Sequence, residues 1–403
     1  MRVGVFHNRY VFRGGEDAVV DLEVELLRKA GHEVHLFSVD SAEIRSWRDR
    51  LRVGLAAGWN GAMAKRVVAF LEEHPVQLGH VHNFFPLLSP AVHAALKQRG
   101  LPVVQTLHNY RLYCANGLFS REARPCEDCV ARGPWNAIRH GCYRGSRLQT
   151  LAWARATAYQ RRPRFWHELV DRFVTPSEFA RCKLVAAGLP SELVVVKPNP
   201  VADPGEPSSG GHGAVYVGRL SAEKGVRFLL EAWRWLGGYP LCIVGTGPEE
   251  AALRSLAADL PEVRLTGQLP PEGVREELAR AAFAVAPSLC YENFPLSVVE
   301  AMAAGKPVVA PRPTAVGEML DEGRTGWLFQ VGDARELAEA CCRLVADPAR
   351  AQQMGRDARS DYEDRFTPER SLERLVALYD EVLAASSFSS FDQRRSAPAC
   401  RGR

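Results

Sequence analysis

The 403-residue sequence lacks several patterns that assign a chain to common protein classes. It has no run of 18 or more apolar residues, and Arg2 leads directly into a strand-like segment, so we expect neither a membrane-spanning helix nor a signal peptide. It has no Gly-x-Gly-x-x-Gly motif, which argues against a nicotinamide-dependent dehydrogenase. It also has no Asp-x-Asp motif that would offer a divalent metal a site. These absences favour a protein kept in the cytoplasm.

Length and charge point to two dissimilar halves. A chain of 403 residues is too long for one small core and predicts two domains. The net charge of +4 is unevenly divided, because residues 1–200 carry 10 more basic than acidic side chains and the remainder carries 6 more acidic than basic ones. We therefore expect anionic ligands or surfaces to meet the first half.

Apolar strand-like runs alternate with amphipathic helical stretches, which predicts an α/β fold with doubly wound parallel sheets. The pattern divides into two Rossmann-like domains, residues 1–200 and 214–367, joined by a Pro-, Gly- and Ser-rich linker at 201–213. Ligands of such sheets bind at the carboxyl ends of strands, so we expect the domains to face a central cleft. An amphipathic helix is predicted over 368–385 and a disordered tail over 386–403. The expected strands are 3–6, 34–37, 79–82, 103–107, 172–175, 193–197, 214–217, 241–244, 264–266, 283–286 and 307–310.

Two glutamates in the second half form the most informative pattern. Glu292 precedes Pro295, whereas Glu300 lies among apolar residues at helical spacing that end at Gly305. This places the first carboxylate on a loop and the second on a helix, facing one pocket. The start of that helix offers unpaired N–H groups and a positive dipole end to a diphosphate, and Arg219 and Lys224 upstream supply cations that neutralise phosphates.

The order of motifs around these acids resembles a known family. Residues 218–225 read Gly-Arg-Leu-Ser-Ala-Glu-Lys-Gly, residues 243–249 read Ile-Val-Gly-Thr-Gly-Pro-Glu, and residues 300–309 read Glu-Ala-Met-Ala-Ala-Gly-Lys-Pro-Val-Val. This series resembles the donor-binding half of glycosyltransferase family 4, a retaining family of the GT-B fold. The resemblance implies a metal-independent hexosyltransferase that uses a nucleoside diphosphate sugar and needs no cofactor.

The resemblance also implies roles for individual residues. Glu292 contacts sugar hydroxyls, Glu300 accepts hydrogen bonds from the nucleotide ribose, and Arg219 with Lys224 stabilises the departing diphosphate. The other donor-binding positions that it implies are Gly15, Gly218, Asn293, Phe294, Pro295 and Leu296.

Two histidines end expected strands of the first half, where a hydrogen-bonding imidazole can face the cleft. By resemblance, His108 contacts the transferring sugar near the reacting centre. His82 is a candidate on the acceptor side. For either residue alone, a hydrogen-bonded structural histidine is an equally good interpretation.

Four of the ten cysteines cluster within an insertion at residues 112–145. One Cys-x-x-Cys flanked by two single cysteines matches the ligand number of a structural zinc site, although its spacing is looser than that of a double Cys-x-x-Cys. Unligated thiols are the alternative, since disulfides are disfavoured in a reducing cytoplasm. The four residues are Cys114, Cys126, Cys129 and Cys142.

The acceptor is the least defined part of the hypothesis. Residues 153–166 mix arginines with aromatics, which is typical either of a surface that meets anionic membrane headgroups or of a helix whose aromatics enter the core. With the basic first half, this favours a glycan or lipid-linked acceptor at the inner face of the plasma membrane, and no nucleic acid. The alternative functions are a GT-B sugar-nucleotide epimerase, a pyridoxal phosphate-dependent phosphorylase and a non-catalytic binding protein stabilised by zinc.

Overall fold

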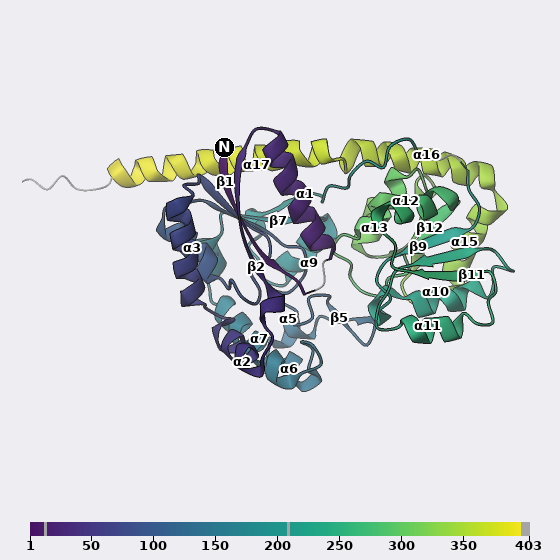
Figure 1. Cartoon of the computed structure of the whole chain (residues 1–403), viewed down its shortest axis with the longest axis horizontal. Coiled ribbons are helices and arrows are strands. Elements are labelled where there is room, and N and C mark those ends of the chain that lie inside the picture. Colours follow the sequence, from purple (N-terminus) through teal and green to yellow (C-terminus); the bar gives the residue numbers. More distant parts are fainter. Residues whose placement is uncertain (12–13, 208–209, 396–403) are drawn as a thin grey trace, which may run out of the picture.

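Two parallel β-sheets, each flanked by helices, form the body of the protein (Figure 1). The computed structural model describes residues 1–11, 14–207 and 210–395. Each sheet has six strands, in the order β2-β1-β3-β4-β7-β8 in the first and β11-β10-β9-β12-β13-β14 in the second. The expected α/β architecture of two doubly wound domains is confirmed.

The first sheet is covered on both faces because its strands alternate apolar side chains between them. Val3 and Val5 of the first strand pack with α1 on one face, whereas Phe6 joins the cluster formed with α3 and α4 on the other. Its strands are β1 (Arg2–Arg9), β2 (Glu33–Asp40), β3 (Leu78–Val81), β4 (Val103–Thr106), β7 (Arg172–Thr175) and β8 (Val194–Val196). Its helices are α1 (Gly15–Lys29), α2 (Trp47–Ala56), α3 (Gly61–Glu73), α4 (Ala91–Gln98), α7 (Arg147–Gln160), α8 (Phe165–Leu169) and α9 (Glu178–Ala186).

The second sheet repeats this arrangement and adds one strand that the sequence did not predict. Strand β14 (Gly326–Gln330) pairs in parallel with β13 at the sheet edge. The other strands are β9 (Ala214–Val217), β10 (Leu241–Val244), β11 (Val263–Gly267), β12 (Phe283–Val285) and β13 (Val308–Arg312). The helices are α10 (Val226–Trp233), α11 (Glu250–Leu256), α12 (Pro271–Arg280), α13 (Leu296–Ala303), α14 (Ala315–Met319), α15 (Ala334–Ala346) and α16 (Pro348–Arg365).

The last helix, α17 (Pro368–Arg395), runs back from the second domain across the first (Figure 1, yellow). Leu375, Leu378, Tyr379 and Val382 pack against β1 and α1, as expected for an amphipathic helix that braces the first domain. The predicted disordered tail began at residue 386, but the helix continues to Arg395. Adding a residue to an existing helix costs less free energy than nucleating a new helix. Residues with a weak helix propensity can therefore extend the helix that precedes them. The rest of the tail, residues 396–403, lies outside the described residues.

The segment with interleaved arginines and aromatics folds as the helix alternative. Trp153 on α7 and Trp166 on α8 are both buried, whereas Arg155, Arg162 and Arg164 are exposed. The aromatics therefore stabilise the core and do not form a surface for membrane headgroups. None of the helices within the described ranges combines the length and apolar composition needed to cross a membrane.

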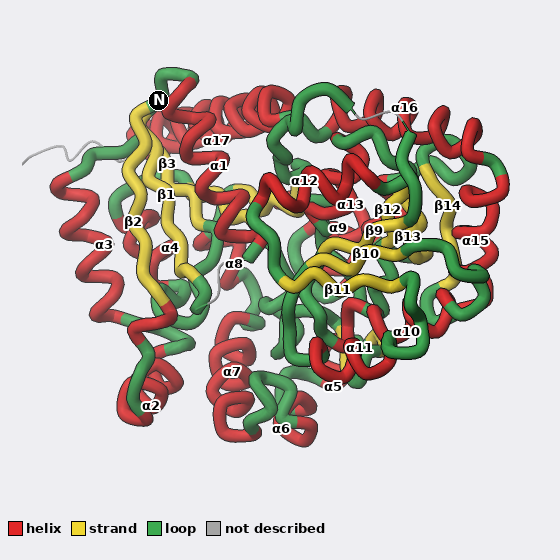
Figure 2. The backbone as a smooth tube through the Cα atoms, turned by 45° about the vertical axis from the view of Figure 1, so that its right-hand side comes forward, coloured by secondary structure: helices red, strands yellow, loops and turns green. Residues whose placement is uncertain are grey.

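The insertion forms a compact lobe beside α7. It contains a short antiparallel hairpin of β5 (Ser120–Arg121) and β6 (Arg124–Pro125), followed by α5 (Asp128–Arg132) and α6 (Asn136–His140). Figure 2 shows α6 and α7 below the first sheet, with α2 beside them. This lobe lies on the side of the first domain where β3 and β4 end.

Candidate active site

His82 and His108 lie together at the carboxyl ends of two neighbouring strands. His82 follows β3 directly, and His108 comes just after β4, so adjacent parallel strands bring both imidazoles to one edge of the sheet. Nδ1 of His82 lies 3.0 Å from Nε2 of His108, and the rings stack with centroids 5.3 Å apart. The two strand ends predicted from the sequence thus form one site.

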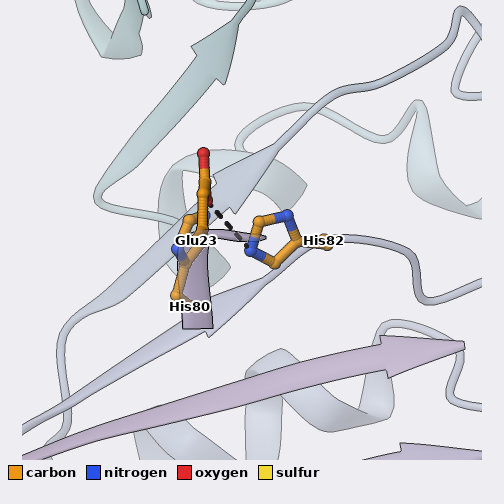
Figure 3. A group of neighbouring side chains, drawn as sticks. All are labelled: Glu23, His80 and His82. Atoms are coloured by element: carbon orange, nitrogen blue, oxygen red, sulfur yellow. Dashed lines mark ion pairs between the residues drawn. The ribbon is translucent and has the colours of Figure 1, made fainter. Parts of the chain in front are cut away.

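Glu23 lies beside His80 and His82 (Figure 3) and forms a buried ion pair with Lys197. One oxygen of Glu23 accepts a hydrogen bond from Nζ of Lys197 at 2.7 Å, and the other lies 3.7 Å from Nε2 of His82. At 3.7 Å this oxygen is too far from Nε2 for a hydrogen bond, and it has no hydrogen-bond partner among the described residues. Its negative charge nevertheless favours an N–H on the nitrogen that faces it, so we infer that His82 carries its proton on Nε2. Its Nδ1 then accepts from Nε2–H of His108, which leaves His108 with its lone pair on Nδ1.

Burial keeps these imidazoles neutral. Desolvation lowers the pKa of His82 and of His108 well below the usual value, and neighbouring histidines add to the effect. Desolvation also lowers the pKa of His80 to about 3. A neutral imidazole has one donor and one acceptor nitrogen, so the tautomer of each ring depends on its hydrogen-bond partners.

Glu23, His80 and His82 are also the only group of three potential metal ligands whose atoms lie within 4.8 Å of one another in the described part of the chain. However, both ring nitrogens of His80 are engaged, with Tyr379 Oη at 2.6 Å and Thr106 Oγ1 at 2.7 Å. The Glu23 carboxylate is already neutralised by Lys197. The cluster is therefore a group of buried side chains behind His108, each with a hydrogen-bond partner of its own, and it leaves no nitrogen of His80 free to bind a metal.

Glu292 lies on the loop between β12 and α13, as predicted, and forms a close ion pair. Its Oε1 accepts from Nζ of Lys224 at 2.5 Å and from the Ser288 hydroxyl at 2.6 Å. Burial alone raises the pKa of Glu292, but Lys224 and Ser288 outweigh it and hold that pKa below its usual value. Burial alone lowers the pKa of Lys224, and Glu292 more than reverses this. Both groups are therefore charged at neutral pH.

Arg219 lies at the end of β9, beside the glycine that the resemblance singled out. A Cβ at Gly218 would lie 2.7 Å from the Tyr216 hydroxyl, which donates a hydrogen bond to the carbonyl of Arg219. Glycine therefore lets the backbone turn tightly here. The Arg219 side chain is exposed, and its guanidinium forms no hydrogen bond or ion pair with any described residue. It is a free cation at the strand end.

A cleft of about 970 Å³ separates the two domains and contains two of the predicted donor-binding residues. Gly15, in the first turn of α1, lines it from one side, and Glu300 on α13 lines it from the other. A Cβ at Gly15 would lie 3.1 Å from Cδ1 of Leu296, so a larger residue would crowd the start of α13. Desolvation raises the pKa of Glu300 above its usual value. Arg13, in the same loop, lies outside the described residues.

The remaining predicted donor residues take different positions. Asn293 bridges the domains, because its Nδ2 donates to the carbonyl of Leu107 at 2.8 Å and its own carbonyl accepts from Ser177 Oγ at 3.0 Å. Its Oδ1 is buried without a partner. Pro295 caps the start of α13, but Phe294 packs its ring against Phe366 in the core of the second domain. Only the backbone of Phe294 is therefore available to a donor.

Sequence reasoning missed several residues of the site. Glu23 and Lys197 are 174 positions apart and show no local signal. Ser288 precedes Glu292 by four residues, and a lone serine on a loop carries no signal of this contact. Tyr110 has a buried hydroxyl without a partner, and its pKa is raised by burial and by charges that include Glu292.

The four clustered cysteines come together in the insertion but do not form a closed ligand set. All four are free thiols, and burial with mutual electrostatic interaction raises the pKa values of Cys129 and Cys142. No three of their sulfur atoms lie within 4.8 Å of one another. In a tetrahedral four-thiolate zinc site they would be about 3.8 Å apart. Structural zinc therefore remains a prediction.

Comparison with known proteins agrees with this geometry. A family model described as Glycosyltransferase Family 4 matches residues 13–203, and one described as Glycosyl transferases group 1 matches residues 211–347. The chain belongs to glycosyltransferase family 4. The boundary between the two matches lies in the segment that joins β8 to β9, so the first covers β2 to β8 and the second covers the whole second sheet of this family 4 protein.

Curated relatives of this family 4 chain have varied names. It is 32% identical to the amylovoran biosynthesis glycosyltransferase AmsK of Erwinia amylovora, over 41% of this chain and 44% of AmsK. It is 33% identical to the phosphatidyl-myo-inositol mannosyltransferase of Mycobacterium leprae, over 54% of this chain and 59% of that protein. These matches span less than two-thirds of either relative. The 2-deoxystreptamine glucosyltransferase of Streptomyces kanamyceticus is 28% identical over 82% of this chain and 84% of that protein.

Solved structures share the fold at low sequence identity. Anabaena HepE in complex with UDP-glucose has a TM-score of 0.67 at 16% identity, covering 94% of this family 4 chain and 100% of HepE. Sucrose-phosphate synthase of Thermosynechococcus elongatus has a TM-score of 0.68 at 21% identity, covering 95% and 99%. These likenesses establish the GT-B fold.

Proposed function

We propose that this protein is a retaining, metal-independent glycosyltransferase that moves a sugar from a nucleoside diphosphate sugar to a glycan or lipid-linked acceptor. The single observation that carries the proposal is the Asn293 bridge, which joins the Glu292 loop of one domain to the strand end that bears His108 in the other. Glycosyl transfer needs such a meeting of donor and acceptor groups in one cleft. The relatives whose names state amylovoran biosynthesis and a phospholipid support the acceptor class.

The proposed roles follow from charge. Breaking the bond between the anomeric carbon and the diphosphate leaves negative charge on the diphosphate and positive charge on the sugar. Lys224, held by Glu292, stabilises the diphosphate from a fixed position, which is the most effective form of electrostatic catalysis, and the exposed guanidinium of Arg219 adds a second positive charge. Glu292, held ionised by Lys224 and Ser288, accepts hydrogen bonds from sugar hydroxyls. His108, with its lone pair on Nδ1, accepts a hydrogen bond from a hydroxyl of the sugar or acceptor.

The donor pocket is tested by binding measurements in the presence of a metal chelator. We expect one class among uridine, guanosine, adenosine and thymidine diphosphate sugars to bind saturably. Because burial raises the pKa of Glu300 and only its ionised form accepts two ribose hydrogen bonds, affinity should increase with pH through that raised pKa. Glu300→Gln should bind more weakly and lose this pH dependence. Folded protein that binds none of the four classes would overturn the proposal.

Retention is tested separately by following the anomeric proton of the product by NMR once a donor is known. The same configuration as in the donor is expected. The epimerase would instead produce an isomerised donor without an acceptor. Neither the epimerase nor the zinc-stabilised binding protein has support from the comparisons.

The network behind His108 gives a third prediction. In Glu23→Gln, an amide N–H can face Nε2 of His82. This favours the tautomer of His82 that has its N–H on Nδ1. His82 then donates to Nε2 of His108, which leaves His108 with an N–H on Nδ1. We expect kcat to fall about 10- to 100-fold at all pH values, with donor affinity unchanged.

Lys197→Met is the matched control, because it breaks the same ion pair but keeps the carboxylate. Its buried Glu23 becomes harder to ionise, so its activity should recover as pH rises, whereas that of Glu23→Gln should not. If both variants lost the same activity with the same pH profile, the Glu23–Lys197 pair would have only a structural role.

A further inference from the structure

Residues of α2 and α7 line an apolar groove of about 500 Å³. Figure 2 shows these two helices below the first sheet, with α6 between them and the second domain. Large apolar side chains line it although they face solvent: Trp47 is 69% exposed, Leu51 53%, Leu55 65% and Leu148 74%. Single exposed apolar residues are common on protein surfaces, but a contiguous set around a hollow marks a binding site.

The charged residues that line this groove are all arginines. Arg50, Arg144 and Arg155 contribute to its wall, and no acidic side chain does. Within the described residues, none of the three guanidinium groups forms an ion pair, although many other arginines of this protein do. The groove therefore offers an apolar surface with unneutralised positive charge, which complements an anionic amphiphile.

The groove shares part of its wall with a small cavity beside His108. Phe85 and Trp153 line both the groove and a small cavity whose wall includes His82 and His108. At this junction the Arg111 guanidinium lies over the ring of Phe85, 5.6 Å from its centroid, and over that of Tyr143 at 5.5 Å. A ligand lying in the groove would therefore have one end beside the imidazoles.

We propose that the groove between α2 and α7 binds the hydrocarbon chain of a lipid-linked acceptor, with the acceptor phosphate against the arginines and the reacting hydroxyl toward His108. This inference rests on the proposed function and names the acceptor class for the same site. A single chain fits better than a flat bilayer surface, because the exposed side chains surround a hollow that shares the residues Phe85 and Trp153 with the cavity beside His108.

Farnesyl diphosphate is a suitable probe because it combines a short isoprenoid chain with an anionic head and dissolves without vesicles. We expect the protein to bind it at least 10-fold more tightly than inorganic pyrophosphate. The double variant Leu51→Gln with Leu148→Gln should lose that preference, since both side chains are exposed and their replacement leaves the core intact. Trp235→Gln, which removes a 56% exposed side chain in the second domain, should keep it.

Other results would overturn the inference. Equal binding of farnesyl diphosphate by the protein and the double variant would place the probe elsewhere, such as the diphosphate site of the donor. Groove-dependent binding to phosphatidylglycerol vesicles without any preference for farnesyl diphosphate would identify a bilayer-binding face. Groove-dependent dimerisation would identify a second copy as the occupant. If the protein binds farnesyl diphosphate in the groove but binds none of the nucleotide sugars, the groove is still a lipid-binding site and the proposed function is overturned instead.

Discussion

Arg219→Ala is expected to lower kcat/KM for sugar transfer about 10²- to 10³-fold, the usual effect of removing one group that stabilises developing negative charge. The same change should leave the melting temperature almost unaltered. The Arg219 side chain is exposed and forms no hydrogen bond or ion pair with a described residue, so its removal breaks no contact in the folded protein. Steady-state kinetics at several donor concentrations and thermal unfolding measure the two effects.

Arg227→Ala is the matched control for this prediction. Arg227 is an exposed arginine nearby, at the start of α10, and pairs at 3.5 Å with Glu249. Its removal should leave both kcat/KM for sugar transfer and the melting temperature almost unchanged. If Arg219→Ala had the same kcat as the unaltered protein at saturating donor, the proposed role of Arg219 in binding the diphosphate would be wrong.

Glu292→Gln is expected to reduce both activity and stability. The variant leaves the ammonium of Lys224 without its carboxylate in a site where the Glu292 side chain is only 11% exposed. Breaking a buried pair from one side costs about 3 kcal/mol in the free energy of unfolding. Transfer should fall about 10²-fold or more, because a neutral amide binds sugar hydroxyls more weakly and no longer holds Lys224 in place.

The stability loss should depend on pH in a defined direction. The pKa of Glu292 is lowered in the folded protein, so its stabilising contribution is complete above the usual value of 4.5 and disappears as pH falls through the lowered value. Denaturant unfolding should therefore show a large difference between the protein and Glu292→Gln at pH 7 that narrows in acid. Glu223→Gln, which removes the neighbouring acid that accepts from Ser221, should lack this pattern. An equally stable Glu292→Gln would contradict the ion pair.

The elements of this site that the sequence predicted are those with a local signal. The loop position of Glu292 and the helical position of Glu300 followed from Pro295 and the spacing of apolar residues. His82 and His108 were found because each ends an apolar strand, and parallel strands end at the same edge. Local patterns of this kind depend on backbone geometry within a few residues.

The rest depends on tertiary contacts that no short pattern contains. Glu23 lies on a helix face that reads as ordinary amphipathic sequence, and only the packing of α1 on the sheet brings it to Lys197. Likewise, α2 and α7 are far apart in the sequence, so neither predicts the groove that they form together. The arginine-rich segment 153–166 contributes Trp153 and Arg155 to this groove, but the exposed apolar side chains lie on α2 and at Leu148, outside that segment.

The return of α17 to the first domain has a consequence for how this chain is made. The core of the first domain includes Leu375 and Tyr379, and Tyr379 also closes the network through its hydrogen bond to His80. A ribosome releases the chain from its beginning, so the first half emerges long before the helix that completes its core. That half must wait, with an apolar face uncovered, until nearly the whole chain has been synthesised. The first domain is therefore the last to be finished.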